Sequence, residues 1–202
     1  MPRDKTESHR KIMEAAREEF LAYGFEKASM RRIGERCSMT AAAIYRHCRD
    51  KEDLFDQLVR PAEERIFSWI QGHIDRYVEA AQAEERLSLR DTEIDMMREV
   101  VYPDMETYHL LLACSQGTRY ENFLHDLTQK SQEQMFRYLH FLKEKGYGVK
   151  DITPRELHIL LTAYTTALFE PVIHRYPEKE ALCCLDKVSD FFLPGWKNLF
   201  GL

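Results

Sequence analysis

The chain of 202 residues is 44% hydrophobic and 31% charged, with a formal net charge of −5 at pH 7, which is the composition of a soluble globular protein. No stretch approaches the ~20 apolar residues of a membrane-spanning helix, and no apolar run of a signal peptide follows the polar N-terminus MPRDKTESHRK. We therefore exclude a membrane-spanning protein and expect a cytoplasmic one, long enough for one large core or two modest domains.

Gly and Pro are scarce, at 8 and 7 residues, and long stretches are rich in Ala, Glu, Leu, Arg and Lys, so we predict an all-α chain. The five cysteines are odd in number and contain no C-x-x-C pair, and we interpret them as reduced. Charge is distributed unevenly. Residues 1–60 hold 13 Lys and Arg against 11 Asp and Glu, whereas residues 61–202 hold 16 against 23. The slight positive balance of the N-terminal part is compatible with a nucleic-acid partner.

The first predicted helix spans residues 5–23, because apolar side chains recur through it at helical spacing and Gly24 ends the pattern. Three short helices are then predicted within residues 24–54. Ser29 is expected to cap the first of these through its hydroxyl group. Two short helices joined by about four residues are typical of a helix-turn-helix, whose second helix enters the DNA major groove.

Residues 40–47 form the candidate recognition helix. Thr40 is expected to cap it, and its first turn holds only the alanines Ala41, Ala42 and Ala43. Small side chains let a helix approach base edges closely, and an alanine methyl group can contact a thymine methyl group.

Cationic and hydroxyl-bearing side chains surround this helix. We expect Tyr45, His47 and Lys51 to bind phosphates. Arg46, Arg31 and the capping threonine are the candidates for contacts with bases or groove edges.

A series of residues across the three short helices has the types and the spacing of a known DNA-binding domain. They are Gly24, Phe25, Ser29, Arg31, Ile33, Thr40, Ile44, Tyr45, His47, Lys51, Glu52, Asp53 and Leu54. This series, within roughly the first sixty residues, resembles the DNA-binding domain of the TetR family of bacterial transcriptional regulators. Ser38 departs from the pattern, since a Gly is usual there, and this indicates a turn with a left-handed backbone. The DNA-binding residues that the resemblance and the residue chemistry suggest are Ser29, Arg31, Arg32, Thr40, Ala41, Ala42, Ala43, Tyr45, Arg46, His47 and Lys51.

Beyond the helix-turn-helix the chain is predicted to stay helical. A long helix over residues 51–84 contains Pro61, which should kink it, and the polar residues 82–91 should form a loop. Further helices are predicted over residues 92–102, 105–116, 119–145, 154–176 and 178–200.

About nine helices result, in two domains. Residues 1–60 form the helix-turn-helix domain, and the resemblance implies that residues 61–202 bind an effector and dimerise. The boundary falls inside the long helix, so movement of its distal half should move the recognition helix. Thr153 and Glu156 have the spacing of a capping box at the start of the penultimate helix.

Many apolar helices of the C-terminal domain carry aromatic, methionine or polar-tipped side chains. For any single residue an ordinary helical core is the simpler interpretation. The resemblance implies a mostly apolar small-molecule pocket between the helices. Our candidates for its lining are Met97, Tyr108, Leu112, Phe123, Tyr164 and Phe169.

The last two predicted helices are apolar on more than one face, which exceeds what a single core-facing stripe requires. The resemblance implies that they pair with their copies in a four-helix dimer interface. A dimer would set two recognition helices about one DNA turn (~34 Å) apart. The candidate interface residues are Leu161, Leu168, Leu185, Val188 and Phe192.

No catalytic motif is present: there is no G-x-S-x-G, glycine-rich phosphate loop or H-E-x-x-H, and the histidines are not spaced as metal ligands. We expect no enzymatic activity, no cofactor and no metal. The favoured interpretation is a homodimeric transcriptional repressor that a small-molecule effector releases from a palindromic operator. Its expected partners are double-stranded operator DNA, the effector and a second copy, and no membrane. Two alternatives stay open: a helical small-molecule-binding module that does not act through DNA, and an activator or architectural DNA binder without an effector.

Overall fold

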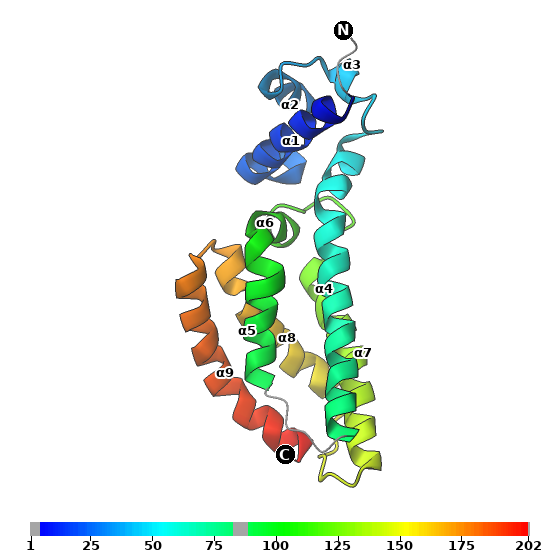
Figure 1. Ribbon diagram of the computed structural model, residues 1–202, viewed down its shortest axis with the longest axis vertical. Coiled ribbons are helices and arrows are strands. Elements are labelled where there is room, and N and C mark those ends of the chain that lie inside the picture. The colour runs from blue at the N-terminus through cyan, green and yellow to red at the C-terminus, as the bar shows by residue number, and fades with distance from the viewer. Residues whose placement is uncertain (1–4, 83–88, 202) are drawn as a thin grey trace. The chain divides into compact units, whose positions relative to one another are not determined.

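The computed structural model describes residues 5–82 and 89–201, which fold into helices and connecting loops (Figure 1). The α-helices are α1 (Lys5–Lys27), α2 (Met30–Arg36), α3 (Ala41–Ile44), α4 (Lys51–Gln82), α5 (Leu89–Met96), α6 (Met105–Ala113), α7 (Phe123–Glu144), α8 (Pro154–Ile173) and α9 (Glu178–Phe200). Between α5 and α6, Met97–Val101 form a π-helical turn and Tyr102–Asp104 a 3-10 turn. The described ranges contain no strand, so the all-α prediction is confirmed, and the expected number of about nine helices is close.

Several predicted boundaries match the structure. The backbone of α1 is kinked at Gly24, where φ is 71°, so its regular part ends where the sequence indicates. The predicted helix over 119–145 begins later, at Phe123, because hydrogen-bonded turns occupy the preceding residues: the Glu121 amide donates to the Thr118 carbonyl at 3.2 Å. The predicted loop over 82–91 lies mostly outside the described residues. Across the described ranges, every helix is too short or too polar to cross a bilayer.

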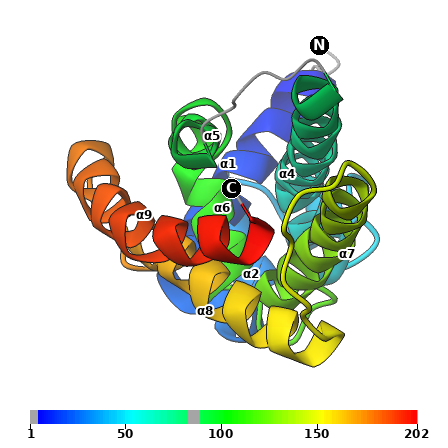
Figure 2. The ribbon, with the colours of Figure 1, turned by 90° about the horizontal axis from the view of Figure 1, so that it is seen from below.

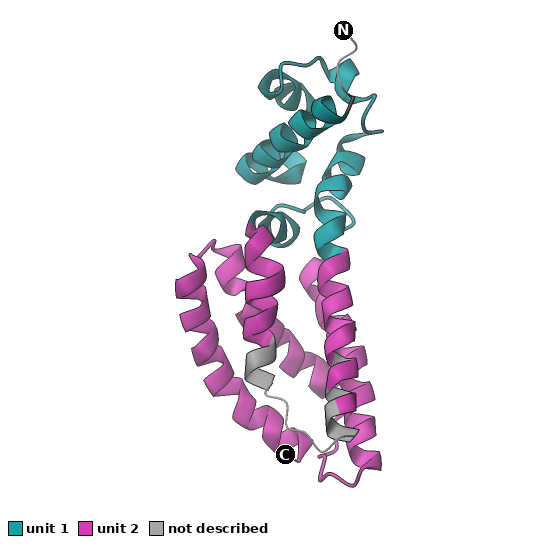
Figure 3. Cartoon of the chain, in the orientation of Figure 1, with its two compact units in different colours: residues 1–63, 106–122 teal, residues 64–105, 123–202 magenta. Residues whose placement is uncertain are grey.

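The chain divides into two compact units (Figure 3). Unit 1 comprises residues 1–63 and 106–122, and unit 2 comprises residues 64–105 and 123–202. Helix α4 belongs to unit 1 in its first part and to unit 2 from Glu64 onward. The chain therefore returns to the N-terminal helices through α6, a long-range arrangement that helical periodicity does not indicate.

Unit 1 has an aromatic core. The Phe55 ring contacts those of Phe20 and Phe25 edge-on, with centroids 5.1 and 5.5 Å apart, and Phe20 and Phe55 are fully buried. Tyr108 of α6 is also fully buried, and its hydroxyl donates to the Ala62 carbonyl at 2.9 Å. Truncation of a buried aromatic ring of this kind costs about 3–5 kcal/mol, so these contacts fix both α1 and α6 against α4.

A buried carboxylate adds polar contacts between α4 and the segment 106–122. Asp56 is 7% exposed and accepts from the Tyr120 hydroxyl at 2.6 Å and from Arg119 Nε at 3.1 Å. Arg60 forms an ion pair with the same carboxylate. Charge-assisted hydrogen bonds satisfy this buried acid, and they hold the returning segment in place.

In unit 2, α8 packs against both α7 and α9 (Figure 2). The start of α8 is a capping box: the Thr153 hydroxyl accepts from the Glu156 amide at 3.3 Å, and the Glu156 carboxylate accepts from the Thr153 amide at 2.8 Å. The capping box predicted there is confirmed.

Candidate nucleic-acid interface and internal cavity

The turn between α2 and α3 depends on two residues. Ser38 has a φ of 55°, so the left-handed position inferred from the sequence is confirmed. The Met39 amide donates to the Gly34 carbonyl at 2.8 Å, and a Cβ on Gly34 would lie 2.6 Å from the Met39 carbonyl oxygen. Gly34 therefore allows the turn to fold back on α2. Sequence reasoning missed this role, although a glycine inside an otherwise helical pattern was the available signal.

Helix α3 is capped as predicted but is shorter than 40–47. The Thr40 hydroxyl accepts from the Ala43 amide at 3.2 Å. Regular α-helix covers Ala41–Ile44, and the chain then tightens, with the His47 amide donating to the Ile44 carbonyl at 2.7 Å. Ile44 is fully buried and anchors the helix in unit 1.

The opposite side of α3 faces outward. Ala42 and Arg46 are exposed, Tyr45 is 50% exposed, and Ala41 and Ala43 are half-buried. The Arg46 side chain makes no hydrogen bond or ion pair with another residue that the structure describes, and its backbone amide donates to the Ala43 carbonyl at 3.3 Å. Tyr45, Arg46 and the cap residue Thr40, which is also exposed, are thus available to a partner.

Helix α1 contributes to the same surface. The His9 ring stacks on the His47 ring with centroids 5.9 Å apart, and Thr6, His9, Arg46 and His47 line a shallow open depression. The structure thus brings two of the predicted DNA-binding residues, Arg46 and His47, next to His9 of α1, which the sequence analysis did not single out.

Two of the predicted DNA-binding residues have structural partners in unit 1. The Ser29 hydroxyl makes no capping hydrogen bond, contrary to expectation; its backbone amide donates to Glu19 Oε1 at 3.1 Å. Arg32 donates to the same oxygen at 2.6 Å and to the Lys27 carbonyl at 2.6 Å. Glu19 is fully buried, and Arg36 is its third partner at 3.4 Å. Glu19 therefore connects α1 to α2. Arg31, by contrast, is exposed and pairs only loosely with Glu35, at 3.6 Å.

Lys51 also has internal partners instead of a free ammonium group. Its Nζ donates to the carbonyls of Phe25, Glu26 and Ala28 at 2.7, 3.1 and 3.2 Å. Burial lowers the pKa of this ammonium, and its Nζ lies 4.4 Å from the centre of the Phe25 ring. All three N–H groups of the Lys51 ammonium are thus used in hydrogen bonds at the C-terminal end of α1. They are not directed to a DNA phosphate, as the sequence had predicted.

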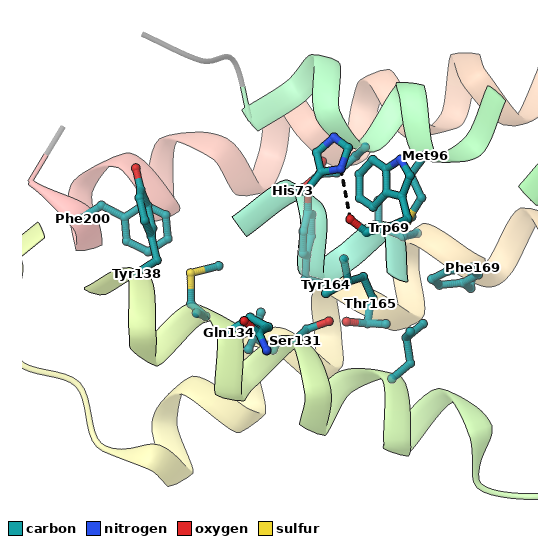
Figure 4. A pocket seen from close by; sticks show the side chains of 16 residues that line it. Trp69, His73, Met96, Ser131, Gln134, Tyr138, Tyr164, Thr165, Phe169 and Phe200 are labelled. Atoms are coloured by element: carbon teal, nitrogen blue, oxygen red, sulfur yellow. Dashed lines mark hydrogen bonds between the residues drawn. The ribbon is translucent and has the colours of Figure 1, made fainter. Parts of the chain in front are cut away.

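Unit 2 contains a partly open cavity of about 140 Å³ among α4, α5, α7, α8 and α9 (Figure 4). Its aromatic lining consists of Trp69, Tyr138, Tyr164, Phe169 and Phe200. Figure 4 shows Tyr138 and Phe200 at one end of the cavity and Phe169 at the other. Most of the remaining lining is aliphatic or methionine, so the walls are predominantly apolar.

Two of the predicted pocket residues, Tyr164 and Phe169, line this cavity. The other four lie elsewhere. Tyr108 and Leu112 belong to unit 1, Met97 is fully buried one position beyond the lining residue Met96, and Phe123 contacts Phe67 with ring centroids 6.1 Å apart.

The cavity also has a polar part, with Glu93, His73, Ser131, Gln134 and Thr165 in its lining. Glu93 Oε2 is buried and has no hydrogen-bond partner. Burial raises the pKa of its carboxyl group to about 7, and an interaction with the Tyr164 hydroxyl offsets this only in part. His73 Nδ1 lies 3.2 Å from the Trp69 carbonyl oxygen, and burial together with the nearby Arg76 lowers the pKa of His73. Neither residue was predicted from the sequence to line a pocket.

Three predicted interface residues are buried within unit 2. Leu161, Leu168 and Leu185 are 3%, 6% and 1% exposed, and the first two line the cavity. They are therefore not available to a second subunit, a correction of the prediction, because a helix that is apolar all round does not reveal which face is internal. Val188 and Phe192 are half-buried. The exposed large apolar side chains of α8 and α9 are Ile159, Leu160 and Phe191.

Residues 12–58, which include the helix-turn-helix, match the model of a known family, "Bacterial regulatory proteins, tetR family". Over 57 residues the chain is 42% identical to the HTH-type transcriptional repressor Rv1474c of Mycobacterium tuberculosis, and over 61 residues it is 39% identical to the HTH-type transcriptional repressor AcnR of Corynebacterium glutamicum. These matches cover 28% and 30% of this chain, and only 30% and 32% of the two relatives.

The whole fold resembles solved structures at low sequence identity. NalD, the secondary repressor of the MexAB-OprM multidrug efflux pump in Pseudomonas aeruginosa, aligns over 93% of this chain and 96% of its own, with a TM-score of 0.59 and 17% identity. The TetR family transcriptional regulator PfmR of Thermus thermophilus aligns over 88% of this chain and 96% of its own, with a TM-score of 0.57 and 17% identity. Residues 12–58 of the chain thus form a DNA-binding domain of the kind found in the tetR family of bacterial regulatory proteins.

Proposed function

We propose that the protein is a homodimeric DNA-binding regulator of transcription in the cytoplasm, and specifically a repressor that a small-molecule effector releases from a palindromic operator. The observation that carries this proposal is the outward face of α3, where Thr40, Ala42, Tyr45 and Arg46 are exposed in a helix-turn-helix of the tetR family. The similarity to two repressors in this region supports repression as the direction of control.

The DNA contacts follow from the exposed chemistry. Arg46 is the strongest candidate for base readout, because its planar guanidinium group has no partner among the described residues and can donate twice to guanine. Tyr45 and His47 are phosphate ligands, and His9 adds a second imidazole next to His47. Arg31 contributes at the groove edge. The role of Ser29, Arg32 and Lys51 is to hold the helices that present these side chains.

The effector part of the proposal depends on the cavity in unit 2. A ligand that fits one arrangement of α4, α5, α7, α8 and α9 better than another shifts the equilibrium between them by its difference in affinity. Helix α4 forms part of the cavity through Trp69 and His73, and it is the next helix after α3, from which residues 45–50 separate it. A change along α4 is therefore the route by which an effector reaches the recognition helix.

Fluorescence anisotropy on the DNA upstream of the protein's own gene, compared with a random duplex over a range of salt concentrations, tests the proposal. We expect tighter and strongly salt-dependent binding to the upstream duplex. Arg46→Ala should reduce the preference by about tenfold or more, since one bidentate base contact is worth about 1–3 kcal/mol. Arg155→Ala, which removes an exposed arginine of α8, is the matched control. Equal weak binding to both duplexes, and to every sequence of a random library, would instead favour a small-molecule-binding module that does not act through DNA.

A further inference from the structure

The cavity of unit 2 has the size of a single ring. Its volume of about 140 Å³ is close to that of an engineered apolar cavity of ~150 Å³ that binds benzene. Trp69, Tyr138, Tyr164, Phe169 and Phe200 supply aromatic faces and edges around it (Figure 4). An apolar ring of six atoms with a short substituent therefore matches the available space.

A buried carboxylate oxygen in this apolar lining lacks a partner. Glu93 Oε2 is buried without a hydrogen bond, although an unsatisfied buried acceptor costs free energy and is rare in native proteins. The raised pKa of this carboxyl group has the same physical origin, namely the removal of water from the charged form. A ligand that donates a hydrogen bond to Oε2 would remove this cost.

The charges of the lining residues indicate which kind of ligand group can donate a hydrogen bond to Glu93. His73 is the only basic residue among the side chains described as lining the cavity, and burial and Arg76 both favour its neutral form. The Arg76 guanidinium group contacts His73, 2.7 Å from its Nε2, but is not part of the lining, so an anionic ligand would meet Glu93 without a cation in the described lining. An ammonium group would pair with the carboxylate and would also be attracted to the faces of the aromatic rings.

We propose that the cavity binds a small lipophilic amine with one ring, whose ammonium group donates to the Glu93 carboxylate while its ring lies among the aromatic side chains. The amine binds whether or not the protein regulates transcription. The inference rests on the proposed function only where it makes such an amine the effector.

Three probes of nearly equal size test the proposal on the unaltered protein: benzylamine, benzyl alcohol and benzoate. Binding is followed by isothermal titration calorimetry and by tryptophan fluorescence, to which Trp69 of the lining contributes along with Trp196, in the absence of DNA. We expect benzylamine to bind at least about tenfold more tightly than benzyl alcohol, since a charge-assisted hydrogen bond is about twice as strong as a neutral one. Benzoate should bind most weakly. Equal affinity for the amine and the alcohol, or tighter binding of benzoate, would overturn the proposal.

The variant Glu93→Gln keeps the shape of the side chain and removes its charge. We expect it to bind benzyl alcohol about as well as the unaltered protein does, but to lose the preference for benzylamine. Glu99→Gln, which removes an exposed carboxylate of unit 2, should retain that preference. Helical circular dichroism of both variants checks that they are folded. If Glu93→Gln keeps the full preference for benzylamine over benzyl alcohol, Glu93 is not the group that binds the ammonium.

Addition of benzylamine to the protein–operator complex separates the two proposals. Tight amine binding without any change in DNA affinity supports the ligand assignment and removes the effector role. DNA binding to the operator with no amine binding overturns the ligand class and leaves the regulator intact.

Discussion

At the residue scale, Lys51 shows how a side chain that suits DNA can serve the fold instead. Its ammonium group donates to three carbonyls at the end of α1. We therefore expect Lys51→Met to lower the free energy of unfolding by about 1–3 kcal/mol, the usual cost of losing hydrogen bonds to a charged group. Urea unfolding measures this loss. The slope of log affinity against log salt concentration should stay unchanged. A decrease of about one in the size of this slope would instead show that Lys51 contacts a phosphate.

Glu93 makes the stability of the protein depend on pH. Burial raises its pKa from 4.5 to about 7, so the folded state holds the proton more tightly than the unfolded state. The stabilising contribution is therefore complete below the unfolded pKa and is lost as the pH rises through about 7. A shift of this size corresponds to about 3 kcal/mol at most.

Between about pH 4.5 and about pH 7, we expect the free energy of unfolding of the unaltered protein to fall by up to this amount relative to that of Glu93→Gln. Unfolding by urea at a series of pH values measures the difference. His73 titrates in both proteins, and its contribution cancels in the comparison. Parallel stability profiles would show that the carboxyl group is not desolvated in the folded state.

At the element scale, the turn between α2 and α3 combines one strained position with one that tolerates no side chain. Ser38 has a φ of 55°, a conformation that costs non-glycine residues about 1 kcal/mol or more. Ser38→Gly should therefore raise the free energy of unfolding by about 0.5–1 kcal/mol. Gly34→Ala should lower it by about 2 kcal/mol or more, because the new Cβ would lie 2.6 Å from the Met39 carbonyl oxygen. Thermal unfolding of the two variants, with Gly72→Ala in open space on α4 as control, checks the opposite signs.

Element ends were largely predictable from the sequence, but the neighbours of each element were not. Thr40 and Thr153 cap their helices as the local sequence indicates, since a cap depends on residues within one turn. The pairing of Glu19 with Arg32, and of Lys51 with the end of α1, joins residues distant in the chain, which no local pattern reveals. The same limit applies to the cavity: α8 is apolar on several faces, so periodicity could not show that Leu161 and Leu168 point inward while Ile159 and Leu160 face outward.

At the scale of the whole molecule, the exposed apolar side chains of α8 and α9 are the basis for the proposed dimer. Phe191 is 79% exposed, Ile159 67% and Leu160 42%, and large apolar side chains of this kind suit an interface when they form one contiguous patch. We expect Phe191→Glu to shift the protein from dimer to monomer in analytical ultracentrifugation, because a buried interface would have to desolvate the new carboxylate. Tyr147→Glu, at an exposed aromatic residue of the loop after α7, is the control and should leave the dimer intact. Because an operator with two half-sites is bound by two linked recognition helices, the monomeric variant should also lose most of its operator affinity while it keeps its affinity for benzylamine. A Phe191→Glu protein that stays dimeric would place the interface on another surface.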